Sequence, residues 1–296
     1  MRVHVIANPT AGRGRTPRLV AALVDALRAQ GATATSYATT GPGDAAAHVA
    51  GLPDDAADRL VVVGGDGTLH EAVNGRAGPL PWPVAIVPVG TANLVARDAG
   101  TPLGGDAAAH ADLVLRGEPW TVDLLATDRG RTLAVAGAGL DAEVVAAVAR
   151  VRRGGLGGYA RWLAPIARTF SDYRPPRLVA VVDGRAVEGG AVIVQNTRCY
   201  GGLFTLSPTA RMDDGRLDVV VLREARRRDC FRMLLSAYAG RLASDRGVSL
   251  LVGTSVEVRA PRPAAVQMDG DPAGTTDFSA RLLPRALTLL RPRRGG

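Results

Sequence analysis

Two glycine-rich loops follow apolar runs in the first third of the sequence. They are Gly64-Gly65-Asp66-Gly67-Thr68, after residues 60–63, and Pro88-Val89-Gly90-Thr91-Ala92-Asn93, after residues 84–87. Glycines allow positive φ angles and let a backbone approach a bulky ligand without a Cβ clash. We expect Thr68 to cap a helix whose N-terminal amides favour a phosphate. The loops therefore indicate a polyanion site, and an ordinary strand-to-helix turn is the alternative for each.

Charged side chains accompany these loops. Asp66 stands between glycines at the end of an apolar run, where the sequence offers no helical or packing reason for a carboxylate. The first apolar run, residues 3–7, ends in Asn8-Pro9-Thr10-Ala11-Gly12-Arg13-Gly14-Arg15, whose guanidiniums can bind phosphate oxygens. All 36 Lys-or-Arg positions are arginine. The absence of lysine excludes a Schiff-base lysine, a Walker A lysine and a kinase strand lysine, so phosphate charge must be neutralised by a metal ion, arginine and backbone amides.

A pair of aspartates lies near the C-terminal end. Asp269-Gly270-Asp271 follows the apolar run at residues 265–268. A carboxylate in such a place can accept the proton of a substrate hydroxyl. Asp-Gly is also the strongest short signal for a hairpin turn, and that interpretation has about equal weight.

The elements that must position these residues change in kind along the chain. Strands predicted at 3–7, 33–38, 59–63 and 84–87 alternate with helices at 18–30, 44–50, 68–74 and 106–116. This alternation predicts an α/β domain with a parallel, Rossmann-like sheet at residues 1–120. Ligands of such sheets lie at the carboxyl ends of the strands, where the three loops fall.

From about Trp120 short strands dominate. They are predicted at 122–126, 133–136, 178–182, 191–195, 217–222, 255–259 and 265–268, with helices at 141–151, 159–169 and 228–243. This pattern predicts a mainly antiparallel β-sandwich domain at residues 121–280 that completes the active site. The tail, residues 281–296, is expected to return to the first domain as a final strand.

Composition limits the function. The chain has 296 residues, 47% of them hydrophobic, and a net charge of +8. No run reaches the length of a membrane span, and Cys199 and Cys230 show no paired spacing, so we expect a cytoplasmic protein. The charge favours peripheral contact with an anionic lipid surface, whereas 4% aromatic residues argue against nucleic-acid binding. The four histidines show no metal-ligand spacing.

Taken together, several motifs resemble the diacylglycerol kinase catalytic-domain family, which includes bacterial soluble lipid kinases and sphingosine kinases and is similar in fold to NAD kinases. Besides the three loops, the resemblance includes Gly137-Ala138-Gly139-Leu140-Asp141-Ala142-Glu143, Asn196, Tyr200-Gly201-Gly202, Ser207-Pro208, Asp213-Asp214-Gly215-Arg216-Leu217-Asp218, Gln267-Met268-Asp269-Gly270-Asp271 and Pro284-Arg285-Ala286-Leu287. It spans nearly the whole chain.

The resemblance implies transfer of the γ-phosphoryl group of ATP, with Mg²⁺, to a hydroxyl of diacylglycerol or a related lipid at the membrane surface. It implies a nucleotide site formed by Asn8, Pro9, Thr40, Gly64, Gly65, Asp66, Gly67, Thr68, Thr91 and Asn93. Asp66 would lie near the phosphates and the catalytic magnesium. Asp269 and Asp271 occupy the place of the general base, and we favour Asp269 because the adjoining Gly270 would let substrate approach. A structural Mg²⁺ would be held by the Asp214 carboxylate and the carbonyls of Arg211 and Arg216.

This sequence departs from the family pattern at His70, at Leu94-Val95 and at Asp271, where relatives often have other residues. Two other functions stay open: an NAD kinase-like kinase of a soluble substrate, and a nucleotide-binding regulator without turnover. The lack of an acid after Asn93 disfavours the first, and the retained aspartates disfavour the second. The sequence leaves open which lipid accepts the phosphoryl group and whether the protein forms a homodimer.

Overall fold

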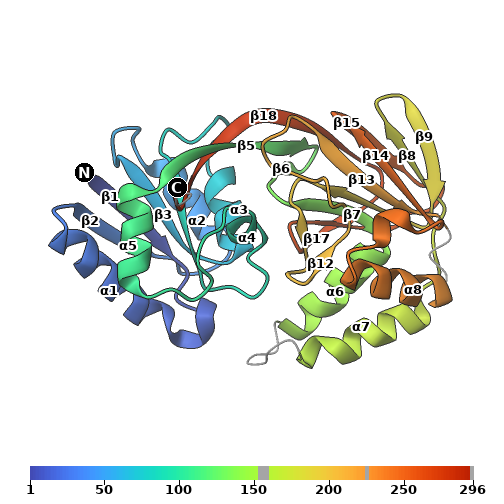
Figure 1. Ribbon diagram of the computed structural model, residues 1–296, viewed down its shortest axis with the longest axis horizontal. Helices are drawn as coiled ribbons and strands as arrows, with labels where there is room; N and C mark the ends of the chain where they lie inside the picture. The colour runs from blue at the N-terminus through green and yellow to red at the C-terminus, as the bar shows by residue number, and fades with distance from the viewer. Residues whose placement is uncertain (153–159, 224–226, 294–296) are drawn as a thin grey trace. The chain divides into compact units, whose positions relative to one another are not determined.

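The computed structural model describes residues 1–152, 160–223 and 227–293. The chain forms two compact units, one made of Met1–Asp123 with Pro284–Gly296 and the other of Leu124–Leu283. Each unit has its own sheet arrangement and its own core (Figure 1).

The first unit is built on a parallel sheet. Its elements are β1 (Arg2–Ala7), the 3-10 helix η1 (Ala11–Gly14), α1 (Thr16–Ala29), β2 (Thr33–Ala38), α2 (Asp44–Gly51), β3 (Arg59–Gly64), α3 (Asp66–Asn74), β4 (Val84–Pro88), α4 (Leu94–Asp98) and α5 (Ala107–Arg116). The strand order is β2-β1-β3-β4, with every pair parallel. Every residue of β4 is buried, as expected for a strand covered on both faces.

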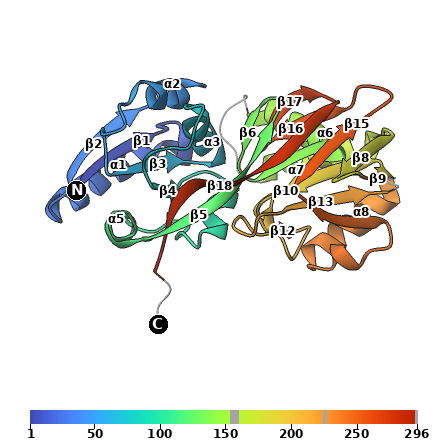
Figure 2. The same ribbon diagram turned by 90° about the horizontal axis from the view of Figure 1, so that it is seen from above.

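Helices cover both faces of this sheet. Val5 and Val61 lie in one apolar cluster with Leu23 and Leu27 of α1 and Val114 of α5. On the opposite face α2 contacts α3, and Figure 2 shows α2 and α5 on opposite sides of the sheet. The α/β class predicted for the N-terminal part is confirmed.

Two long strands contribute to both units. They are β5 (Glu118–Thr127) and β18 (Phe278–Arg291). Leu289 of β18 pairs with Val84 of β4 in the first unit, whereas Phe278 pairs with Val258 in the second.

The described part of the second unit is a sandwich of antiparallel strands accompanied by helices. Its further elements are β6 (Gly130–Thr132), β7 (Val135–Gly139), α6 (Leu140–Arg152), α7 (Ala160–Asp172), β8 (Leu178–Val182), β9 (Arg185–Gly189), β10 (Ala191–Gln195), β11 (Cys199–Tyr200), β12 (Phe204–Thr205), β13 (Leu217–Leu222), α8 (Arg227–Tyr238), η2 (Leu242–Ser244), β14 (Val248–Gly253), β15 (Ser255–Arg259), β16 (Ala265–Met268) and β17 (Asp271–Thr275).

One sheet has the order β14-β13-β10-β7-β16-β17, and the other contains β15, β8 and β9 beside β18. Val192 and Val219 of the first sheet share a core cluster with Val256 and Phe278 of the second. The predicted β-sandwich is therefore confirmed. None of the described helices is long and apolar enough to cross a membrane.

Candidate functional site

The predicted loops of the first unit leave one edge of its sheet together. Backbone bonds continue past the strand ends: Asn8 N–H donates to Val63 O at 3.0 Å, and Val89 N–H donates to Gly64 O at 3.0 Å. Thr39 N–H likewise donates to Ala7 O at 2.8 Å. Because β1, β3 and β4 are neighbours, their loops begin side by side, as ligand loops of open α/β sheets do.

The glycines of these loops serve close packing rather than unusual dihedral angles. Gly64 ends β3, Gly65 has φ −102°, and Gly67 lies in the first turn of α3, so these glycines do not use the positive φ that glycine allows. A Cβ on Gly90 would come within 2.6 Å of Gly65 Cα, and one on Gly64 within 2.6 Å of the Thr68 side chain. The two loops thus contact each other backbone to backbone, which only glycine permits.

Asp66 has a local structural role that the sequence did not reveal. The helix α3 begins at Asp66, two residues before the predicted start, with Gly65 at the N-cap. A carboxylate in the first turn is stabilised by the N-terminal end of the helix dipole. One Asp66 oxygen also accepts Val95 N–H of α4 at 3.3 Å, and the side chain is half-buried.

Thr68 lies inside α3 and is not its cap, which corrects the expectation above. Its buried hydroxyl accepts a long bond of 3.5 Å from Asn8 Nδ2. Asn8 Oδ1 in turn accepts Thr10 N–H at 3.0 Å, so Asn8 links the β1 loop to α3. The Arg15 side chain is exposed, and the side chain of Arg13 lies outside the described part of the structure.

Asn93 provides a buried acceptor next to the two glycines. It adopts left-handed angles, with φ 50° and ψ 53°, and its Nδ2 donates to Gly90 O at 2.8 Å. Its Oδ1 is buried and has no hydrogen-bond partner within the described residues. An unpaired buried acceptor is costly unless a ligand donates to it, so this loop pair fits a bound nucleotide with its hydroxyl and amino donors. The neighbouring Thr91 is exposed.

Thr40 is held by a carboxylate at the start of α2. Asp44 accepts Thr40 N–H at 2.6 Å, the Thr40 hydroxyl at 2.9 Å and the Tyr37 hydroxyl at 2.9 Å. The hydrogen bond from the Thr40 amide has the largest effect on the Asp44 carboxylate, and those from the two hydroxyls have smaller effects. Together they hold the pKa of Asp44 below its usual value. The exposed Thr40 therefore has a fixed place at the end of β2.

A histidine pair lies beside this carboxylate. The Nε2 atoms of His4 and His48 are 2.8 Å apart, and the His48 ring stacks on Tyr37 with a centroid distance of 3.6 Å. Burial lowers the pKa of His4, and His48 lowers it further. Burial also lowers the pKa of His48, against a smaller opposing effect of Asp44. Because only one N–H can lie between the two rings, the pair excludes double protonation.

In the second unit, Asp269 and Gly270 form the turn of a hairpin. Met268 of β16 pairs with Asp271 of β17, and the two turn residues have φ 49° and φ 83°. Positive φ at both positions is typical of a two-residue hairpin turn. The structure therefore has the hairpin turn that the sequence offered as an alternative. In this turn the carboxylates of Asp269 and Asp271 have different surroundings.

The Asp269 carboxylate accepts three backbone N–H groups. Leu133 and Ala134 donate to it at 2.8 Å, and Val135 donates at 3.1 Å. Asp271 begins β17 and is exposed. Of the two aspartates, Asp271 therefore presents its side chain at the surface, while Asp269 binds the start of β7.

The predicted structural magnesium loop is a tight turn before β13. Asp214 Oδ1 accepts Arg216 N–H at 3.1 Å, and Gly215 has φ 73°. The Arg211 guanidinium pairs with Asp213 at 3.0 Å. Within the described residues no cluster of three or more His, Cys, Asp or Glu side chains is placed to hold a metal. One carboxylate with two carbonyls is a different donor set, so Mg²⁺ here stays a prediction.

Asp141 is a buried acid to which the motif analysis gave no role. It lies in the first turn of α6 and accepts Gln267 Nε2 at 2.6 Å and the Tyr200 hydroxyl. Burial raises the pKa of Asp141 to about 6, although the Gln267 bond opposes this. A perturbed carboxylate of this kind is typical of functional sites. Its place after Gly137 and Gly139 was the available sequence signal.

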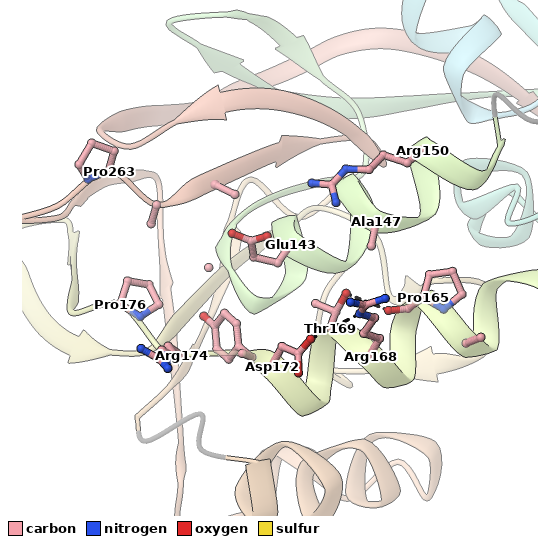
Figure 3. Close-up of a pocket in the computed structure, with 15 residues that line it drawn as sticks. Glu143, Ala147, Arg150, Pro165, Arg168, Thr169, Asp172, Arg174, Pro176 and Pro263 are labelled. Carbon is pink, nitrogen blue, oxygen red and sulfur yellow. Dashed lines mark hydrogen bonds and ion pairs between the residues drawn. The ribbon is translucent and has the colours of Figure 1, made fainter.

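A cavity of about 840 Å³ lies in the same unit, between α6 and α7 (Figure 3). Its walls are formed largely by small and apolar side chains, including Ala147, Ala164, Pro165, Pro263 and Ala265. Charged side chains that also line it are Glu143, Arg150, Arg168, Asp172 and Arg174. Its size is that of sites for organic ligands with an apolar part.

Known protein families match both parts of the chain. Residues 2–127 match the diacylglycerol kinase catalytic domain, and residues 134–291 match the YegS C-terminal NAD kinase beta sandwich-like domain. The diacylglycerol kinase of Mycobacterium tuberculosis (strain ATCC 25618 / H37Rv) is 30% identical, over 99% of this chain and 96% of the relative. The diacylglycerol kinase of Bacillus subtilis (strain 168) is 29% identical, over 92% of this chain and 90% of the relative.

Solved structures agree in fold. A Bacillus anthracis str. Sterne protein, provisionally assigned as a diacylglycerol kinase, aligns with a TM-score of 0.80 and 25% identity, covering 99% of this chain and 97% of that protein. An NAD kinase from Archaeoglobus fulgidus in complex with ATP aligns with a TM-score of 0.57 and 13% identity, covering 99% and 94%. The second likeness concerns the fold alone.

The histidine pair predicts acid sensitivity of the first unit. Unfolded histidine has a pKa of about 6.5, and in the folded chain both values are lowered, so the unfolded state binds more protons below that pH. Stability should therefore fall as the pH decreases through about 6.5. The variant His48→Phe keeps a ring against Tyr37. Urea denaturation at pH 7.5 and 5.5 should show that it loses less free energy of unfolding between these pH values than the unaltered chain.

The raised pKa of Asp141 has the opposite effect, since it makes stability increase as the pH decreases. Asp141 is present in both the unaltered chain and His48→Phe, so the difference between their losses of stability reports the histidine pair. An equal loss of stability in the unaltered chain and in His48→Phe would contradict the assignment.

Proposed function

The chain belongs to the diacylglycerol kinase family, and from this we propose that it transfers the γ-phosphoryl group of ATP to a hydroxyl group of a lipid, with diacylglycerol as the first candidate. The observation that supports this most directly is the pair of adjoining loops in the first unit, where Asp66 and the unpaired Asn93 Oδ1 lie at the carboxyl ends of β3 and β4. The cavity of the second unit is large enough for part of a lipid.

We propose that the first unit binds the nucleotide. Asn93 Oδ1 would accept a donor of ATP, Thr40 and Thr91 would lie along it, and Asp66 would hold Mg²⁺ through its carboxylate. When bound, Mg²⁺ neutralises charge on the phosphate oxygens. The backbone amides of the loops and the exposed Arg15 would supply the remaining positive potential, since the chain has no lysine.

We propose Asp271 as the acceptor of the hydroxyl proton. The three N–H bonds to Asp269 occupy the carboxylate that the sequence favoured, whereas Asp271 is exposed at the start of β17. The proton of the lipid hydroxyl would pass to Asp271 while the hydroxyl oxygen bonds to the γ-phosphorus of ATP. The bond between that phosphorus and the ADP oxygen would break in the same step.

We also propose that the chain works in the cytoplasm at an anionic membrane surface. Leu203, Leu235 and Tyr238 are 59%, 55% and 73% exposed, and α8 contacts β12 beside them (Figure 1). Exposed apolar side chains of this size mark interaction surfaces. The sequence has two basic clusters, Arg226-Arg227-Arg228 and Arg291 to Arg294. Arg226 lies outside the described residues, and Arg291 is engaged by Glu118 at 2.6 Å.

The activity test uses Asp66→Asn. The unaltered chain should phosphorylate detergent-dispersed diacylglycerol or another lipid alcohol in the presence of ATP and Mg²⁺, with the product identified by mass spectrometry. Asp66→Asn should lower kcat by about 100-fold or more, because it removes charge from the phosphate site while leaving the core intact. Phosphorylation of NAD rather than any lipid, or a normal kcat in the variant, would contradict the proposal.

Asparagine variants of the two hairpin aspartates should differ in which property they change, kcat or the unfolding midpoint. Asp271→Asn should lower kcat by about 100-fold or more, with unchanged ATP affinity and an unchanged unfolding midpoint. Asp269→Asn should instead lower the unfolding midpoint, because the single oxygen of an amide cannot accept all three backbone N–H groups. The reverse pattern, a folded but inactive Asp269→Asn with an active Asp271→Asn, would return the base role to Asp269.

Vesicle flotation tests the surface proposal. The unaltered chain should float with phosphatidylglycerol vesicles more than with phosphatidylcholine vesicles, and salt should reduce the difference. Leu203→Ser with Leu235→Ser should reduce flotation about ten-fold or more, since each leucine contributes about 1.5–3 kcal/mol on burial. Leu250→Ser, at a less exposed leucine of β14, is the matched control. Equal recovery with both lipids would exclude electrostatic attraction.

A further inference from the structure

A chain of hydrogen bonds in the second unit joins a buried acid to the Asp269-Gly270 turn. Gln267 Nε2 donates to Asp141 Oδ2 at 2.6 Å, and Gln267 Oε1 accepts Gly270 N–H at 2.9 Å. The Tyr200 hydroxyl donates to the other Asp141 oxygen. Gln267 is 2% exposed, so its amide exchanges these partners for water only at a cost. One side chain therefore contacts both the acid and the turn.

The bonds have a fixed direction. An ionised carboxylate only accepts, so Asp141 selects the orientation of Gln267 in which Nε2 faces α6 and Oε1 faces the turn. The space for this arrangement comes from Gly137, where a Cβ would lie 2.1 Å from Asp141 Oδ2. The opposite side of the turn is held by Asp269, whose carboxylate binds the Leu133–Val135 amides. Both residues that precede Asp271 are thus fixed.

We infer that Asp141 and Gln267 are positioning residues that direct the Asp271 carboxylate through the backbone of Gly270. This inference rests on the proposed function, in which Asp271 accepts the hydroxyl proton. The positive φ angles of Asp269 and Gly270 set the direction in which the chain enters β17, and hence the Cβ direction of Asp271. Misplacing a reacting group by about 1 Å can cost about 100-fold in rate, so a flexible turn would be sufficient to reduce catalysis.

Asp141→Asn does not break the chain, because its amide can turn so that Oδ1 still accepts Gln267 Nε2 while Nδ2 donates to the Tyr200 hydroxyl. The first test is therefore Asp141→Leu, which has a similar volume but removes both acceptors, so that Gln267 Nε2 loses its partner and the direction of its amide is no longer fixed. We expect kcat for the lipid substrate to fall about ten-fold or more while the KM for ATP stays within two-fold. Hydrogen exchange at the Gly270 amide should accelerate in the same variant, which reports the turn independently of activity.

The second test is rescue by reversed polarity. Gln267→Glu alone places two carboxyl groups face to face, and kcat should again fall at a pH where both are ionised. When Asp141→Asn and Gln267→Glu are combined, the amide introduced at position 141 can donate to the carboxylate introduced at position 267, and the second oxygen of that carboxylate accepts Gly270 N–H. We expect kcat and Gly270 protection to recover about five-fold or more over Gln267→Glu alone. Gln195→Glu is the matched control, since this buried side chain donates to Thr197 O instead, and kcat should stay within two-fold.

The outcomes separate the two proposals. If the unaltered chain phosphorylates no lipid, the proposed function fails. If the unaltered chain is active and Asp141→Leu retains its kcat, the positioning role alone fails. Failure of the double variant to recover, with Gln267→Glu alone folded and slow, would also overturn the hydrogen-bond chain as the cause.

Discussion

Aspartate carboxylates that accept backbone N–H groups hold the irregular parts of both units. Asp44 binds the Thr40 amide, Asp66 binds Val95, Asp183 binds Thr254 and Ser255, and Asp269 binds Leu133, Ala134 and Val135. Hydrogen bonds to a charged acceptor are stronger than those between neutral groups, and a buried N–H that loses its acceptor carries the cost of desolvation. The loops that contain these aspartates therefore keep their shape without regular secondary structure. In the hairpin of the second unit, such bonds distinguish Asp269, which stabilises the turn, from the exposed Asp271.

Much of the first unit could be predicted from the sequence because its signals are local. Residues 60–63 and 84–87 are continuous apolar runs, and β3 and β4 are buried along their length. The start of α3 could not be placed as well, because the surrounding glycines disguise a first helical turn that begins at Asp66. In the second unit, the strands that were not predicted are β6, β9, β11, β12, β14 and β17. Of these, β9 and β17 are largely exposed edge strands, and β17 contains proline and glycine, so neither has the apolar alternation that reveals a strand.

The roles of the site residues depend on partners far away in the sequence. Asp269 and Asp271 have the same chemistry and are two positions apart, yet only the bonds from Leu133–Val135 distinguish them. Gly65 likewise needs no side chain because Gly90 lies against it, a reason that no local φ preference expresses. The motifs therefore identified where the chemistry lies, whereas the division of labour within each motif follows from contacts between segments that are distant along the chain.

The buried Asp141 network is best understood from its cost. Burial raises the pKa of Asp141 to about 6, which corresponds to about 3 kcal/mol against the ionised form at this position. A pair of apolar side chains of similar volume would fill the space without that cost, as replacements of buried ionic groups often show. Apolar packing, however, has no direction, whereas the carboxylate, the Gln267 amide and Gly270 N–H can be satisfied together in only one orientation. The network thus exchanges stability for a defined turn backbone, a useful exchange where the next residue, Asp271, must present its carboxylate in one direction.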